Sequence, residues 1–194
     1  MYSIRPNLIL GFHGCDLSVV KKVINGEEPL QSSHNEYDWL GSGVYFWEND
    51  YERALDFAKE AKKRKGSGIR TPAVIGAVIC LENCLDLTTQ KSIIEFKQVY
   101  ETLKKTIDSA KFSKIQNKGK NINGDHLLRY KDRFVIESLH EFRRRAKYKE
   151  YDSVKAAFWE GSSIYENAGF KEKNHIQICI RNPKCILGYF LPLN

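Results

Sequence analysis

The sequence predicts an α+β fold in one domain that spans residues 1–194. Two observations support this class. Short apolar runs typical of buried strands and longer segments with apolar residues at helical spacing occur along the chain, but they do not alternate regularly as in a doubly wound sheet. The 194 residues, of which 42% are hydrophobic, are also enough to build one hydrophobic core.

The first half of the chain is expected to hold three strands and two helices. The apolar run over residues 8–14 ends at glycine, which is typical of a short buried strand with His13 near its end. The next segment places apolar residues on one face, and Asp16 or Ser18 can cap it as a helix. In order, we expect a strand over residues 8–14, a helix over 16–25, a polar loop over 31–38, a loop and strand over 39–47, a helix over 50–65 capped by Asn49 or Asp50, and a central strand over 73–81.

The second half is expected to hold two further helices and two late strands. Apolar residues form one stripe over residues 92–110, which is typical of an amphipathic helix. Residues 134–148 are expected to be helical and to carry three consecutive arginines near their end. Isoleucines alternate with polar residues over residues 176–180, and a turn separates this strand from a second apolar run over 185–190.

The charge is uneven along the chain. The formal net charge is +7, yet residues 111–149 alone carry twelve Lys and Arg against four Asp and Glu, so the rest is nearly neutral. We therefore expect a basic insertion around residues 111–149, of which residues 111–125 are polar and mobile. Such a stretch can attract a polyanion such as RNA or DNA, although a solvated surface has the same composition.

Cysteine use and hydropathy indicate a cytoplasmic protein without a membrane span. The chain has no run of about 18 apolar residues and no signal-peptide pattern at its start. An odd number of cysteines argues against a disulfide framework, and no Cys-x-x-Cys pair occurs, so no metal is expected and small buried side chains are the favoured interpretation. The cysteines are Cys15, Cys80, Cys84, Cys179 and Cys185.

Two short motifs resemble those of a known enzyme superfamily. Residues 12–14, Phe-His-Gly, resemble the Tyr-His-Gly motif of the poly(ADP-ribose) polymerase and diphtheria-toxin-like branch of the ADP-ribosyltransferases, and residues 41–46, Gly-Ser-Gly-Val-Tyr-Phe, resemble its Gly-x-Gly-x-Tyr-Phe segment. A helix with alanines and an aromatic residue follows, and a late strand pair stands where the family keeps its third site residue. The resemblance, from about Gly11 to Phe190, implies a split β-sheet with an NAD crevice and flanking helices.

The resemblance also implies roles for individual residues. Cleavage of the nicotinamide–ribose bond creates an oxocarbenium-like ribose, so the site must hold the ribose hydroxyls, the carboxamide and the departing ring. A histidine can hydrogen-bond a ribose hydroxyl, a glycine lets backbone groups reach the carboxamide, and an aromatic ring can stack on nicotinamide. By resemblance, the catalytic residues are His13, Tyr45 and Gln177, and the NAD-binding residues are His13, Gly14, Gly43, Tyr45 and Phe57. A structural histidine, a simple glycine turn and a core phenylalanine are the alternatives.

The third position departs from the family, which commonly has a glutamate there to stabilise the developing cation. The strand over residues 174–180 offers Gln177 or His175, and Gln177 is preferred because it can bind a ribose hydroxyl. Glu160 or Glu172 could instead supply a carboxylate from the segment before this strand.

The predicted function is mono-ADP-ribosyl transfer from NAD, in a bacterial toxin or defence effector that acts on nucleic acid, with RNA favoured over DNA. Such an effector implies a neutralising antitoxin protein as a partner. A protein acceptor, a module that binds NAD or ADP-ribose without turnover, and an RNA 2′-phosphotransferase are the alternatives. The last would need a basic cluster in the site, which the motifs around His13 and Tyr45 do not supply.

Overall fold

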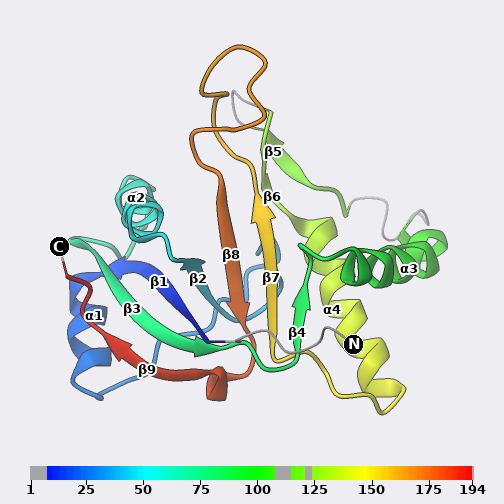
Figure 1. The fold of residues 1–194 in the computed structure, drawn as a ribbon, viewed down its shortest axis with the longest axis horizontal. Coiled ribbons are helices and arrows are strands. Elements are labelled where there is room, and N and C mark those ends of the chain that lie inside the picture. The colour runs from blue at the N-terminus through cyan, green and yellow to red at the C-terminus, as the bar shows by residue number, and fades with distance from the viewer. Residues whose placement is uncertain (1–7, 108–114, 121–123, 194) are drawn as a thin grey trace.

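A mixed sheet of seven strands forms the centre of the molecule (Figure 1). The computed structural model describes residues 8–107, 115–120 and 124–193. The strand order is β4-β7-β8-β2-β1-β3-β9, and neighbours are antiparallel except for the parallel pair β4 and β7. The strands are β1 (Leu8–Asp16), β2 (Val44–Glu48), β3 (Pro72–Cys80), β4 (Cys84–Asp86), β7 (Ser153–Phe158), β8 (His175–Ile180) and β9 (Ile186–Phe190).

The helices cover the two faces of the sheet unequally. Buried residues of α1 (Leu17–Ile24) join a core cluster with Phe46, Ile75 and Ile178, and we call this side the α1 face. Helices α2 (Tyr51–Lys62), α3 (Gln90–Ile107) and α4 (Tyr130–Arg145) contribute to two clusters on the other side, which we call the α2–α4 face. The predicted α+β class is confirmed. In the described part of the chain, none of the helices has the length and apolar character to cross a membrane.

Alanines allow α2 to lie directly against β1. Asp50 caps the helix by accepting a hydrogen bond from the Arg53 backbone N–H at 2.9 Å, as the sequence predicts. Ala54 and Ala58 are fully buried, and the Ala54 carbonyl stands where a side chain at Gly14 would project. The closeness of helix and strand therefore depends on the absence of a Cβ atom at Gly14.

Several elements differ from the sequence predictions. Strands β4 and β7 were not expected, and β5 (Lys118–Lys120), which lies within the segment predicted to be mobile, pairs with β6 (His126–Leu128) in a short hairpin. Helix α4 begins four residues earlier than expected, and the two late strands lie apart because β8 pairs with β2 and β7 while β9 pairs with β3. Residues 111–114 and 121–123 of the predicted mobile insertion lie outside the described residues.

Candidate functional site

The sheet order brings three motif-bearing segments to the middle of the sheet. Strand β8 lies beside β2, and β2 lies beside β1 (Figure 1). Tyr45 pairs with Cys179, and Trp47 pairs both with Gln177 of β8 and with Phe12 of β1. The segments around His13, Tyr45 and Gln177 thus lie on neighbouring strands, although Gln177 is more than a hundred residues from the other two in sequence.

His13 joins β1 to β2 where the two strands separate. Their backbone pairing is confined to Gly11 and Phe12 of β1, and beyond it the His13 Nδ1 atom lies 2.7 Å from the Tyr45 carbonyl oxygen. Because a carbonyl oxygen only accepts hydrogen bonds, Nδ1 must carry the proton and Nε2 must be the lone-pair acceptor. Burial lowers the pKa of His13, so the ring is neutral at pH 7. It can accept, but not donate, a hydrogen bond at Nε2.

The side chains of His13 and Tyr45 project from opposite faces of the sheet. His13 pairs with Ile75 on the α1 face and lies 5.8 Å from the Phe46 ring, whereas Tyr45 contacts the cluster on the α2–α4 face. The Tyr45 hydroxyl donates to the Gly41 carbonyl at 2.6 Å and accepts from the Leu40 N–H at 3.0 Å. Burial raises the pKa of this hydroxyl. Tyr45 therefore anchors the preceding turn in addition to presenting its ring.

The turn over residues 41–43 is also held by α4. Glu137 accepts hydrogen bonds from the Ser42 N–H at 2.7 Å and from both terminal nitrogens of Arg181 at 2.9 and 3.0 Å. Burial opposes ionisation of Glu137, but the bonds and charge of Arg181 outweigh it and lower the pKa of the carboxyl to about 2. Gly43 lies directly against the Ile180 carbonyl, where a larger residue would collide. The glycine motif is thus a fixed part of the fold.

Gln177 lies on the α2–α4 face between Trp47 of β2 and Ala156 of β7. Its side chain is half-buried. Phe57 of α2 lies on the same face with its ring centroid 4.9 Å from that of Trp47. The structure therefore places Gln177, Phe57 and Tyr45 on one face, with the His13 ring on the other.

A row of rings crosses the α2–α4 face and links α2 to the start of α4. The centroid separations along this row are 4.9, 6.4, 5.6 and 4.6 Å. Arg53 lies 5.7 Å from the Trp47 ring inside the row, and Arg129 lies 4.7 Å from the Trp39 ring at one end. In order, the rings of this aromatic row are Phe57, Trp47, His175, Phe158 and Trp39.

A buried ion pair lies beside the aromatic row. Arg53 Nη2 is 3.1 Å from Glu160 Oε2, and the two side chains are only 11% and 10% exposed. His175 Nδ1 lies 3.8 Å from the same oxygen. Sequence reasoning missed Arg53 and Trp47. A signal was present, since Arg53 precedes Phe57 by four residues and therefore shares its face of the helix.

The alternatives for the third site position are now separated in space. Gln177 and His175 lie on the α2–α4 face, and Glu160 is close to His175 but paired with Arg53. Glu172 is exposed and accepts a hydrogen bond from the Ser162 N–H at 3.2 Å. Among these four residues, Glu160 is the carboxylate that adjoins the aromatic row.

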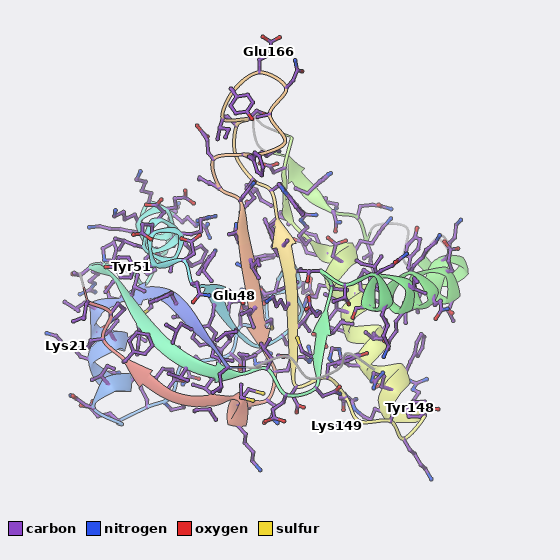
Figure 2. All side chains as sticks on the ribbon, viewed as in Figure 1. Lys21, Glu48, Tyr51, Tyr148, Lys149 and Glu166 are labelled. Carbon is purple, nitrogen blue, oxygen red and sulfur yellow. The ribbon has the colours of Figure 1, made fainter. Side chains whose placement is uncertain are left out.

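The arginine run at the end of α4 is largely neutralised by glutamates. Arg143 pairs with Glu95 at 2.9 Å, and Arg144 and Arg145 each lie 2.6 Å from Glu141. Among the aromatic residues in this basic stretch, Phe134 and Phe142 pack against the core, while Tyr148 is exposed. In Figure 2, Tyr148 and Glu166 lie at opposite ends of the molecule. The run is therefore remote from the β7–β8 loop that contains Glu166.

Two surface depressions lie near the predicted residues, and one of them is lined by the predicted residue Gly43. One of about 410 Å³ borders Gly43 and Arg181, and one of about 500 Å³ lies between α1 and residues 68–71. Neither is lined by His13, Tyr45 or Gln177. Among the described residues, no group of three or more His, Cys, Asp or Glu side chains is arranged to hold a metal ion.

Comparison with known proteins finds one uncharacterized relative in an archaeon. No family model matches the chain. An uncharacterized protein of Methanocaldococcus jannaschii is 27% identical over 191 residues, which cover 90% of this chain and 83% of that protein. This similarity extends over nearly the whole chain and carries no information on activity.

Proposed function

We propose that the protein is an NAD-dependent mono-ADP-ribosyltransferase. The observation that carries the proposal is the convergence of the three motif segments on strands β8, β2 and β1. The order of short motifs along a chain does not by itself bring them together in space. A site that binds one dinucleotide needs the three segments to be close to one another. The relative from M. jannaschii adds no support, because its activity is unknown.

The residues supply the groups that the reaction needs. The amide of Gln177 can bind a ribose hydroxyl on the α2–α4 face, and Nε2 of neutral His13, on the α1 face where β1 and β2 separate, can accept a hydrogen bond from another hydroxyl. The half-buried ring of Tyr45, on the same face as Gln177, offers a flat surface for nicotinamide. Departure of nicotinamide leaves positive charge on the ribose, and the acceptor nucleophile then bonds to its C1′ carbon and loses a proton.

The same geometry motivates a second candidate, a module that binds NAD or ADP-ribose without turnover. Position 177 carries no charge, and the carboxylate of Glu160 is neutralised by Arg53 at 3.1 Å. A developing cation would gain little from a carboxylate that is already paired. The two candidates share a binding mode and differ in whether nicotinamide is released.

Nicotinamide release from NAD tests the proposal. The folded protein should release nicotinamide, and Gln177→Ala should reduce the rate at least about tenfold, whereas Gln98→Ala on the exposed side of α3 should not. NAD binding without release would support the second candidate. Absence of both binding and release would refute the two together.

For the acceptor, we propose RNA rather than DNA, with a protein acceptor as the alternative. The ion pairs of the arginine run reduce the charge available for phosphate contacts, so the support for this step is the net charge of +7 rather than a local patch. Transfer of label from NAD to RNA that weakens with salt would support it. A role as a toxin or defence effector with an antitoxin partner stays a prediction.

A further inference from the structure

Arg53 holds hydrogen-bond donors that the protein itself does not use. Its Nη2 atom binds Glu160, but Nε and Nη1 have no partner among the described residues and are shielded from solvent. A guanidinium group stays protonated at any physiological pH, so these N–H groups are permanent donors. Leaving charged donors buried and unbonded is unfavourable, and native structures usually avoid it unless a ligand completes the set.

Two other unpartnered nitrogens belong to the same cluster. Trp47 Nε1 and His175 Nε2 are buried without a hydrogen bond, and the two rings lie 6.4 Å apart. The Arg53 guanidinium lies 5.7 Å from the Trp47 ring. His175 Nδ1 lies 2.9 Å from the Lys173 carbonyl oxygen, so Nδ1 carries the proton and Nε2 is an acceptor in the neutral ring. The cluster thus combines Arg and Trp donors with a histidine that can take up a proton.

The groups of this cluster match a tetrahedral oxyanion better than a neutral ligand. The guanidinium edge of Arg53 on α2 can bind two oxygens of one phosphate, and the indole N–H of Trp47 on β2 can bind a third. His175 can accept from a protonated phosphate oxygen, or donate to an ionised one after protonation. The Glu160 carboxylate already binds Nη2 of the guanidinium, as an anion would.

We propose that Arg53, Trp47 and His175 form a binding site for a phosphate-ester anion, and that Glu160 acts as its internal competitor. An incoming phosphate displaces the Glu160 carboxylate from Nη2, because both edges of the guanidinium that can bind two oxygens, Nε–Nη2 and Nη1–Nη2, include this nitrogen. The phosphate can come from the pyrophosphate of NAD, which rests on the proposed function, or from a nucleic-acid acceptor. The anion chemistry is common to both sources.

Titration calorimetry of the full chain with inorganic pyrophosphate tests the site. Arg53→Lys keeps the charge beside Glu160 but loses the planar fork, so pyrophosphate should bind about tenfold more weakly. Glu160→Gln removes the competing carboxylate, and binding should tighten by about the same factor. If Arg53 and Glu160 formed only a structural ion pair, the two substitutions would not change pyrophosphate binding in opposite directions. Melting temperatures establish that each variant is folded.

A second buried ion pair provides the matched control. Lys155 and Glu48 are both 14% exposed and lie on the α1 face. Figure 2 shows Glu48 in the middle of the sheet. Lys155→Met removes a buried cation of similar exposure and should leave pyrophosphate binding unchanged. Loss of binding in this variant, equal binding by Arg53→Lys and the unmodified chain, or no binding by the unmodified chain would each overturn the proposal.

Titration with NAD and with a 5′-phosphorylated RNA hexamer identifies the source. Weaker NAD binding by Arg53→Lys assigns the site to the dinucleotide, and weaker RNA binding alone assigns it to the acceptor. If neither ligand responds to Arg53→Lys, the phosphate-ester assignment is wrong. Pyrophosphate binding that depends on Arg53 in a protein that does not release nicotinamide would uphold the site while the proposed transferase function fails.

Discussion

Glu137 hydrogen-bonds both to the glycine turn over residues 41–43 and to Arg181. We expect that replacing its carboxylate with a neutral amide loosens this turn. The carboxylate accepts two bonds from Arg181, at 2.9 and 3.0 Å, and one from the Ser42 N–H at 2.7 Å. In Glu137→Gln, one oxygen can still serve Ser42, but the amide NH₂ group then faces the guanidinium as donor against donor. The Arg181 side chain, only 16% exposed, is left without its counter-ion.

The expected loss of stability follows from these contacts. A hydrogen bond to a charged group contributes about 1.5–3 kcal/mol, and removing one partner of a buried pair costs about 3–5 kcal/mol. Because both side chains keep some solvent contact, we expect a loss of about 2–3 kcal/mol in the free energy of unfolding. For a chain of this length, this lowers Tm by about 4–12 °C.

The pH dependence of the free energy of unfolding provides an independent test of this role of Glu137. The pKa of Glu137 is about 2 in the folded protein and 4.5 ordinarily, so the ionised group stabilises the fold above its ordinary pKa. That contribution is lost as the pH falls from about 5 toward 2. Glu137→Gln should therefore be less stable at pH 7 but should lose less stability on acidification than the unmodified protein.

Thermal unfolding followed by circular dichroism at pH 7 and pH 3.5 measures both effects. The control is Glu141→Gln on the same helix, because Glu141 is 37% exposed and forms surface ion pairs worth about 0–1 kcal/mol. Equal melting temperatures for the Glu137 and Glu141 variants at pH 7 would refute the reasoning. An unchanged pH profile in Glu137→Gln would refute the role of its charge.

Three further predictions concern the motif residues. Gly14→Ala should destabilise the fold by about 1–3 kcal/mol in urea unfolding, because its Cβ meets the Ala54 carbonyl; unchanged stability would show that α2 can shift freely. Tyr45→Phe should lose about 1–2 kcal/mol, since the Gly41 and Leu40 backbone groups lose their partner, and a neutral result would mean that water replaces the hydroxyl. Burial lowers the pKa of His13, so as the pH falls this residue takes up a proton in the unfolded chain before it does so in the folded protein. The free energy of unfolding should therefore fall as the pH drops below about 6.5, and equal stability at pH 7.5 and 5.5 would contradict this.

Elements with strong local patterns were predictable from the sequence. The apolar run of β1, the capped helix α2 and the alternating isoleucines of β8 all lie where their patterns indicate. Strand β7 was missed because the Ser-Val-Lys-Ala-Ala-Phe segment is short and rich in alanine, which has little strand preference. Its extended form depends on its pairing with β4 and β8. The start of α4 was missed because no side chain caps it.

Some residues of the candidate site could also be predicted from the sequence, but their arrangement in space could not. His13, Tyr45 and Gln177 stand in motifs, and Glu160 was considered as an alternative carboxylate. Their orientation depends on strand register, since a shift of one residue exchanges the two faces. The observed register places His13 on the α1 face, and Tyr45 and Gln177 on the α2–α4 face.

The sequence alone determined the α+β class, the periodicity of the main helices and strands, and the residue types available for chemistry, because these depend on contacts between near neighbours. The tertiary structure decided the sheet order, the neutralisation of the arginine run, and the Arg53–Glu160 pair, whose members are 107 residues apart. Contacts between residues so far apart in sequence depend on which segments bury their apolar faces together, and local sequence patterns do not specify this.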